Sequence, residues 1–423
     1  MTSEVLILNK LGVVLGADSA VTTSGGSHPR YSKSATKIFE LASNGAVAAT
    51  IFGGALVDLV PWELAIKLFR AHLGNASFAR VSEYGSALIQ FLSGNNQLFP
   101  ETLRNQWIEG QFDEALKVLL QEVRREAPAV LDENLPVADR HAQWAQQANR
   151  IRTLLHGQGV HASLSQAPLT NILADLTAWT ARAQAQIDLL PSLGGVSAIE
   201  LAELGHLVRY TRPDSILGST GVVVAGYGSS EIFPAYQQLV VQGHIGDELC
   251  CKVEKTFEVT HHGIAMIQPF ARTSMIQTFT DGFSPSLEHI LHTEGRRAIE
   301  SVFADLSARG VQVPQADIDA IVGQRHTSFM TDWKRENWRQ NFNPLVEVLQ
   351  TLSIQEMAHL AESLLGLESL KERVTSPTET VGGPIDVAAI TKSEGLVWIK
   401  RKHYFDADLN MRYATRVARS LQQ

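Results

Sequence analysis

The sequence predicts an α+β fold in which strand-rich blocks alternate with long helical stretches. Three observations predict it. Short apolar runs separated by turn residues open the chain, a helical pattern with few strand signals fills about 101–214, and strand signals return near 221–267 and after 385. Between the last two strand blocks, helical character covers about 271–372. The expected strands are therefore separated by two long helical segments.

Composition and charge limit the function classes. The chain has 423 residues, 44% of them hydrophobic, so it can bury a full core in two or three domains or in one with large insertions. A net charge of −8 argues against a sequence-wide attraction to nucleic acid or anionic membranes. Two cysteines exclude a disulfide framework, and the apolar run at 5–8 is too short for a signal peptide. We expect a cytoplasmic protein without a transmembrane helix.

Four strands are expected in the first 53 residues, at 5–8, 13–15, 37–41 and 46–52. The first two are continuously apolar, which is typical of strands covered on both faces. Leu11-Gly12 supplies the turn between them, residues 23–29 form a loop, and Gly53-Gly54 ends the fourth strand.

Two amphipathic helices follow these strands. Pro61 suits the first turn of one helix, and its apolar residues recur on one helical face, at Trp62, Ile66, Phe69 and Leu73. Gly74 is a suitable end for that helix. A second helix is expected over about 81–93.

The rest of the chain is predicted more coarsely. Prolines are expected to break the helices of 101–214, near Pro128, Pro136, Pro168 and Pro191. Later strands are expected at 221–226, 237–241, 263–267, 385–390 and 396–400. The helical stretch before the last two strands should break near Gly310 and Pro344.

The N-terminus combines residues that suit a nucleophile. Thr2 directly follows the initiator Met and precedes an apolar strand. If Met1 is removed, Thr2 gains an α-amine whose ordinary pKa is about 7.7–8.0, which lets it act as a general base for its own hydroxyl.

Such a nucleophile needs three helpers. A nearby ammonium group favours the neutral, proton-accepting amine, a carboxylate holds that ammonium group, and a backbone N–H stabilises the oxyanion. Asp18, Lys37 and the Gly53-Gly54 turn are the matching residues on the early strands. Each alone has an ordinary structural explanation, as a turn residue, a solvated lysine or a turn, and only their joint order indicates chemistry.

These segments resemble the β-type subunits of the proteasome and their bacterial relatives, which are N-terminal nucleophile (Ntn) hydrolases. The matching segments are Gly12–Ser19, Lys37–Leu41 and Gly53–Ala55. Lys37 lies a few residues later than the family pattern, and the loop Ser24–Ser34 absorbs that insertion. Val222–Tyr227 and Val381–Val387 look like later family segments.

The resemblance implies a four-layer αββα sandwich with two inserted, mainly helical regions. The Ntn core would then occupy three stretches, and the insertions two, in the chain order 2–100 (core), 101–214 (insertion), 215–283 (core), 284–377 (insertion) and 378–415 (last core strands).

The resemblance also implies residue roles. Thr2 is the nucleophile, Lys37 tunes its amine, Asp18 holds Lys37, and the Gly53 N–H binds the oxyanion. Ser19, Gly54 and Glu379 are secondary candidates, and Lys33 is an alternative to Lys37. No metal or cofactor is implied.

The sequence departs from the family at its supporting residues. The family places a Ser before the late Gly-Gly and an Asp three residues earlier, where this chain has Val381 and Thr378, with Glu379 one place off. Another helper Ser follows the strand at 266–270 in the family, and Thr273 and Ser274 are the nearest hydroxyls here.

The leading hypothesis is a threonine-type amide or peptide hydrolase, a threonine protease in the broad sense. One alternative is an Ntn amidase that acts on a small-molecule amide, with the inserted helices covering the peptide groove. The other is a catalytically silent, proteasome-like assembly protein. The resemblance implies a homo-oligomer and leaves open whether it is a ring and whether an unfoldase serves it. Cys250-Cys251 and His261-His262 fit no standard zinc spacing and are read as strand and turn residues.

Overall fold

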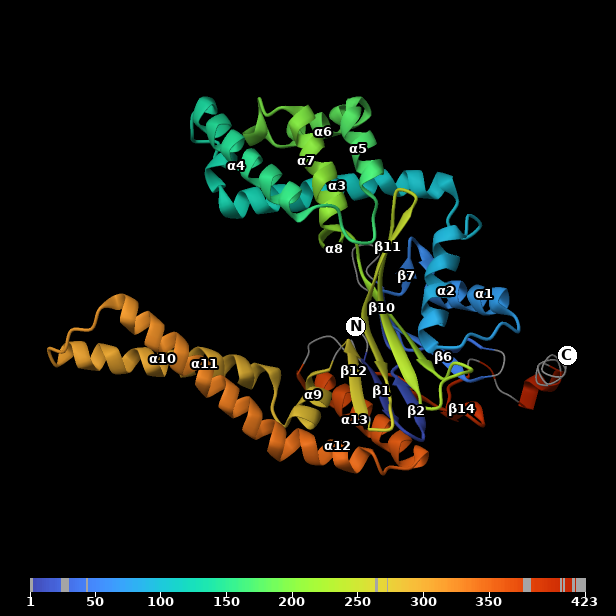
Figure 1. Cartoon of the computed structure of the whole chain (residues 1–423). Coiled ribbons are helices and arrows are strands. Elements are labelled where there is room, and N and C mark those ends of the chain that lie inside the picture. The colour runs from blue at the N-terminus through green and yellow to red at the C-terminus, as the bar shows by residue number, and fades with distance from the viewer. Residues whose placement is uncertain are drawn as a thin grey trace.

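The computed structural model confirms the α+β class: helices surround and extend from antiparallel sheets (Figure 1). It describes residues 3–23, 30–42, 45–262, 265–271, 273–375, 382–403, 405, 408–412 and 415. Thr2 and Glu379 therefore lie outside the described residues.

The strands form two five-stranded sheets. The first sheet has the order β12-β1-β2-β13-β14, with bounds Met266–Ala271, Ser3–Asn9, Gly12–Ala17, Asp386–Thr391 and Gly395–Lys400. The second has the order β11-β10-β9-β6-β5, with bounds Glu248–Glu258, Ala235–Ile245, Thr220–Gly226, Val47–Gly53 and Ile38–Glu40. Two short hairpins add β3 (Val21–Thr23) with β4 (Arg30–Ser32), and β7 (Leu56–Val57) with β8 (Val60–Pro61).

Hydrophobic side chains join the two sheets face to face. Leu6, Leu8 and Leu15 of the first sheet pack with Ala48 and Val223 of the second in one buried cluster. The alternation along β1 explains this, because its other side chains, such as Val5 and Ile7, point to the opposite face. Both faces of β1 and β2 are therefore buried, as their continuous apolar runs predict.

Helices cover the outer face of each sheet. Helices α1 (Trp62–Leu73) and α2 (Val81–Gly94) pack on the second sheet through Trp62, Phe69 and Leu88. On the first sheet, α13 (Ile354–Thr375) packs through Ala361 and Leu365.

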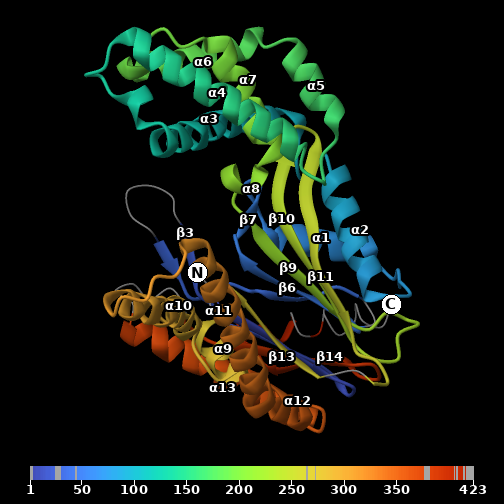
Figure 2. The same ribbon diagram turned by 60° about the vertical axis from the view of Figure 1, so that its left-hand side comes forward.

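Two helical projections leave this body on the same side (Figures 1 and 2). One contains α3 (Glu101–Glu126), α4 (Val137–Gln158), α5 (Gln166–Ala174), α6 (Thr177–Leu189), α7 (Ala198–Thr211) and α8 (Pro213–Ile216). We call it the helical insertion; its buried cluster also includes Ile245 of β10 and Cys250 of β11.

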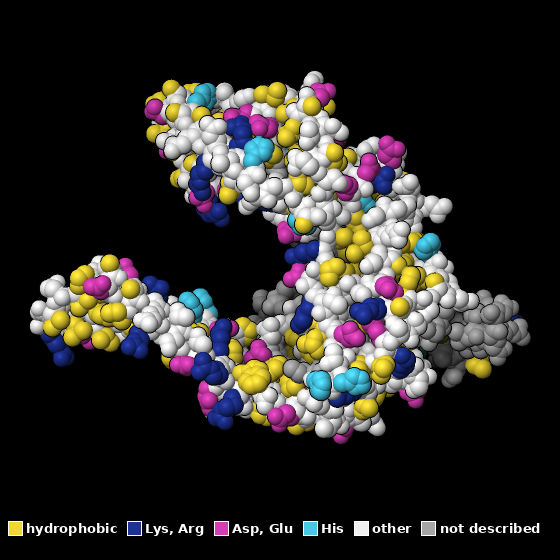
Figure 3. Space-filling model, in the orientation of Figure 1, with side chains coloured by type: hydrophobic (Ala, Val, Ile, Leu, Met, Phe, Trp, Pro, Cys, Tyr) yellow, Lys and Arg dark blue, Asp and Glu magenta, His cyan; other side chains and the backbone are white. Residues whose placement is uncertain are grey.

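The second projection is a helical hairpin of α10 (Pro285–Ala308) and α11 (Gln315–Asn337), which we call the arm. It follows α9 (Ser274–Asp281) and leads into α12 (Asn343–Leu349). Figure 3 shows an open recess between the arm and the helical insertion, and the beginning of β1 lies on the side of that recess in Figures 1 and 2.

The break expected near Pro168 is confirmed, since α4 ends at Gln158 and α5 begins at Gln166, with Pro168 in its first turn, where its missing N–H would have no helical partner anyway. Other element predictions are wrong in detail. Pro344 lies at the start of α12, which continues from α11 through a π-helical segment, Trp338–Phe342. The strand expected at 263–267 is β12, three or four residues later.

The strand β11 was not predicted as a run of its own. It is the edge strand of the second sheet and exposes charged side chains from Lys252 to Lys255, so it lacks an apolar alternation. No helix in the described part of the chain is both long and apolar enough to cross a membrane.

Candidate active site

A buried ion pair joins the two sheets beside the start of β1. Lys37 Nζ lies 2.6 Å from Asp18 Oδ1, and the two side chains are only 4% and 1% exposed. Lys37 Nζ also donates to the carbonyl oxygen of Ala20 at 2.8 Å. Asp18 follows β2 of the first sheet, and Lys37 precedes β5 of the second, so the pair forms where the ends of these strands meet.

Asp18 also fixes two backbone segments. Its Oδ1 accepts the N–H of Ser3 at 3.1 Å, and its own N–H donates to the Ser3 carbonyl at 3.1 Å. Its Oδ2 accepts the N–H of Gly382 at 2.8 Å. One carboxylate therefore holds three groups together: Lys37, Ser3 at the start of β1, and Gly382 of the late Gly-Gly segment.

Ser19 strengthens this junction. Its hydroxyl donates to the Pro384 carbonyl at 2.5 Å, beside the bond from Gly382 to Asp18. Lys33, the alternative to Lys37, is exposed, and its backbone lies against Gly383. The ion pair with Asp18 is made by Lys37.

The Gly53-Gly54 turn at the end of β6 borders the same cavity as Lys37. Gly53 has φ +83°, and a Cβ there would lie 3.0 Å from the Ser219 carbonyl oxygen, so both the conformation and the space require glycine. The Gly54 N–H donates to that carbonyl oxygen at 3.2 Å. The Gly54 N–H therefore already has a partner, and Gly53 is the last residue of β6 in its ladder with β9.

A cavity of about 250 Å³ connects Lys37 to this turn. Its walls are mainly apolar, with Ala20, Ala35, Ile51, Phe52, Leu56 and Pro61 among them, and Lys37, Gly53 and Gly54 border it together. The structure therefore brings Lys37, Gly53 and Gly54 to one apolar cavity, and Asp18 lies behind it in the ion pair with Lys37.

Sequence reasoning missed a polar cluster next to the end of β12. Ser3 pairs with Ala271 across the β1–β12 ladder, so the first residues of α9 lie near the beginning of β1. The Ser274 hydroxyl donates to Glu368 Oε1 at 3.0 Å and accepts from Lys371 Nζ at 2.9 Å. Glu368 Oε2 also accepts the Met275 N–H at 2.7 Å.

This cluster supplies a hydroxyl and a carboxylate near the site, but from different positions than the family pattern suggests. Glu368 is 1% exposed and lies on α13, nearly 100 residues after Ser274. A buried Glu at helical spacing gives no sequence signal that could pair it with Ser274. The only hint was that Ser274 follows the strand at which a helper hydroxyl was sought.

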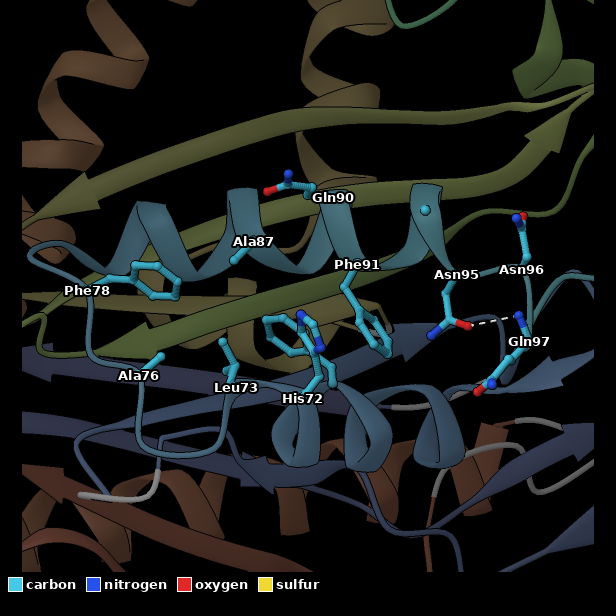
Figure 4. A pocket seen from close by; sticks show the side chains of 12 residues that line it. His72, Leu73, Ala76, Phe78, Ala87, Gln90, Phe91, Asn95, Asn96 and Gln97 are labelled. Carbon is cyan, nitrogen blue, oxygen red and sulfur yellow. Dashed lines mark hydrogen bonds between the residues drawn. The ribbon is translucent and has the colours of Figure 1, made fainter.

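A second, larger cavity lies elsewhere, between α1 and α2. His72 of α1 and Phe91 of α2 face each other there, with ring centroids 5.2 Å apart (Figure 4). Asn95, Asn96 and Gln97 close one end. None of its lining residues borders the cavity at Lys37, so it is separate from the candidate site.

The described residues contain no group of three or more His, Cys, Asp or Glu side chains arranged to hold a metal ion. Cys250 lies in β11 and is fully buried, and burial raises the pKa of its thiol to about 11. The thiol is therefore protonated near neutral pH and is a poor nucleophile.

Comparisons with known proteins give only weak likenesses. No family model matches the sequence, and no curated protein does. Among solved structures, Anbu (ancestral beta-subunit) from Yersinia bercovieri is similar at 9% identity and a TM-score of 0.26, over 100% of this chain and 97% of that one. Anbu from Hyphomicrobium sp. strain MC1 is similar at 8% identity and a TM-score of 0.30, with the same coverage. At such TM-scores the likeness carries no argument about this chain.

Proposed function

We propose that the chain is a threonine-type Ntn hydrolase that cleaves an amide or peptide bond. The observation that supports it best is the buried Asp18–Lys37 pair, tied through Asp18 to Ser3 and placed beside the Gly53 turn. A buried ion pair is a weak source of stability, because desolvating both charges costs about as much as their attraction returns. Its contact with Ser3, the residue that follows Thr2 in the sequence, and its position beside an apolar cavity give it a chemical purpose.

In this proposal, removal of Met1 exposes the α-amine of Thr2. The Thr2 hydroxyl oxygen attacks the carbonyl carbon of the substrate, and its proton passes to the α-amine. The negative charge that develops on the carbonyl oxygen is stabilised by the Gly53 N–H. The protonated amine then gives its proton to the leaving amine, and water hydrolyses the resulting ester to restore Thr2.

The buried groups have separate roles in these steps. The Lys37 ammonium group, held by Asp18, favours the neutral form of the Thr2 amine by like-charge repulsion. Ser274, with Glu368 and Lys371, gives the protons a polar route on the other side of β1. Glu379 remains a proposed helper outside the described residues.

The cavity favours an apolar group on the acyl side of the scissile bond. Its walls are largely aliphatic and aromatic, and about 250 Å³ admits a medium-sized side chain. The preference for an apolar acyl group is the same whether the substrate is a peptide or a small amide. The open recess in Figure 3 favours a peptide, because the described helices leave an approach to the side where β1 begins.

We also propose that the protein self-assembles. Helix α10 has no fully buried side chain over 24 residues, and Leu287, Ile290 and Val302 are 42–54% exposed. Apolar side chains grouped on a projecting element favour a protein partner, and a second copy of the chain fits the proposed relationship to proteasome-like assemblies.

Hydrolysis of short peptide amides tests the proposed chemistry. The assay compares the purified chain with Thr2→Ala and Thr2→Ser, using a fluorescent leaving amine behind Ala, Leu, Phe, Lys or Glu. We expect cleavage after apolar residues that Thr2→Ser retains in part and Thr2→Ala loses by at least 10³-fold, as for removal of a nucleophile. Equal cleavage by Thr2→Ala would overturn the proposal.

A further inference from the structure

The hairpin of β7 and β8, which borders the cavity, has a bulky residue at a positive φ in its turn. Strands β7 and β8 are joined by Asp58 and Leu59, which have φ +45° and +68°. Glycine, asparagine or aspartate normally occupies such positions, so Asp58 suits its place, whereas the bulky Leu59 is a genuine outlier. Leu56 and Pro61 of the same hairpin line the cavity at Lys37. The turn therefore directly joins the two short strands whose residues Leu56 and Pro61 line the candidate site.

A buried contact holds this turn. The Asp58 carboxylate accepts the backbone N–H of His244 at 3.0 Å and lies 2.5 Å from His244 Nδ1. The two side chains are 6% and 3% exposed. Strained backbone persists only where its surroundings impose it, and the bonds to His244 fix Asp58, the residue next to the strained Leu59.

His244 is held in turn by the helical insertion. Gln111 of α3 is 2% exposed, and its Nε2 donates to the His244 carbonyl oxygen at 2.6 Å. Its Oε1 accepts from Arg209 Nε of α7 at 3.1 Å, and Arg209 is fully buried. A continuous chain of contacts therefore runs from the core of the insertion through Gln111 and His244 to Asp58.

We infer that the helical insertion sets the shape of the cavity at Lys37 through the contacts Arg209–Gln111–His244–Asp58. Gln111, His244 and Asp58 are positioning residues, because none of them lines the cavity. The enzymatic consequence, control over which acyl group the cavity accepts, rests on the proposed function. The structural consequence does not.

Gln111→Glu tests the link at a single bond. Glutamate keeps the oxygen that accepts from Arg209 and removes the N–H that donates to His244, so the buried Arg209 retains its partner. Gln111→Met removes both bonds and is the second variant. The matched control is Gln147→Met, which replaces a 6% exposed glutamine on α4 of the same insertion.

The readout is hydrogen exchange of the full-length chain, followed in peptides that cover residues 53–63. Protected amides there include Gly54 N–H and Trp62 N–H, which donate to the Ser219 and Ala55 carbonyls. We expect exchange in this segment to accelerate roughly tenfold in both Gln111 variants, the scale of one lost buried hydrogen bond, and not in Gln147→Met. If both folded Gln111 variants exchange like the parent over 53–63, the inference is overturned.

Kinetics separate this inference from the proposed function. In a chain that cleaves amides, the ratio of kcat/KM between substrates with Leu and Ala before the scissile bond should change several-fold in Gln111→Glu, mainly through KM. A chain without any Thr2-dependent hydrolysis contradicts the proposed function and leaves the exchange result standing. Altered exchange with an unchanged substrate ratio contradicts control over the acyl group.

Discussion

A few polar side chains that are buried away from water determine the geometry of the candidate site. Asp18 is the central one, since its two oxygens bind Lys37, Ser3 and Gly382. A carboxylate with several donors is held in one orientation, and it holds its partners in turn. The geometry around the beginning of β1 is therefore set before any substrate binds.

Replacing Lys37 should be costly to the fold as well as to activity. Lys37→Met leaves the Asp18 carboxylate buried without its cation, which typically destabilises a protein by about 3–5 kcal/mol. The urea midpoint at pH 7.5 measures this. The control is Lys67→Met, whose ion pair with Glu63 is 63% and 45% exposed, and the expected loss there is below about 1 kcal/mol. Similar losses for both variants would contradict the burial argument.

At the scale of elements, the sequence predicts what local pattern controls and misses what distant pairing controls. The positions of α1 and of strands β1, β2 and β6 follow from apolar spacing, and the order of Asp18, Lys37 and Gly53 follows from these strands. The contacts of Asp58 with His244 and of Ser274 with Glu368 join residues 186 and 94 positions apart. No periodicity records such pairings, and only the packing of sheets and helices creates them.

The start of α9 depends on one of these distant contacts. Glu368→Ala removes the acceptor of both the Ser274 hydroxyl and the Met275 N–H, and leaving them unpaired should cost about 1–3 kcal/mol of unfolding free energy. Chemical denaturation measures the loss. Glu347→Ala, on the exposed face of α12, is the control and should change stability by less than about 0.5 kcal/mol. A loss in the control as large as that in Glu368→Ala would argue against this role of Glu368 at the start of α9.

We expect His206 of helix α7 to make the helical insertion less stable in acid. His206 is fully buried between Phe112 and Trp179, and burial, aided by the nearby Arg209 charge, lowers its pKa to about 3. The unfolded chain binds a proton at this residue below about pH 6.5, whereas the folded chain does not until about pH 3. Stability should therefore fall by about 1.4 kcal/mol per pH unit between these values.

The matching variant is His206→Leu, which has no proton to bind. Urea unfolding at pH 7.5 and 4.5 should show a smaller loss of unfolding free energy in this variant than in the parent. The two losses should differ by about 3 kcal/mol, the value for two pH units below 6.5. His156→Leu, on the exposed face of α4, should behave as the parent does. An equal acid loss in the parent and in His206→Leu would show that this histidine is not the cause.

For the whole molecule, the arm and the helical insertion extend from the side on which β1 begins (Figures 1 and 3). The sequence places both as long helical segments but gives no direction to either, because their orientation is set by the connections from α2 to α3 and from α9 to α10. The insertion is tied to the body through Gln111 and His244, whereas α10 carries exposed apolar side chains without a fully buried one.

This difference predicts which projection mediates assembly. Sedimentation equilibrium should give a multiple of the 46.3 kDa chain mass. Joint replacement of Leu287, Ile290 and Val302 by Ser should lower that mass, because it removes apolar area that a partner would bury. Joint replacement of Val137, Leu154 and Ile199, equally exposed on the insertion, should not. A monomer at micromolar concentration, or loss of assembly only in the second variant, would contradict this role of the arm.

Intact mass spectrometry can establish whether Thr2 is the nucleophile. The native chain is measured before and after incubation with a peptide epoxyketone, which reacts with the hydroxyl and the free α-amine of an N-terminal threonine, and Thr2→Ala is the control. We expect a mass without Met1 and a single adduct that Thr2→Ala does not form. Retention of Met1, or an adduct that persists in Thr2→Ala, would show that Thr2 is not the nucleophile.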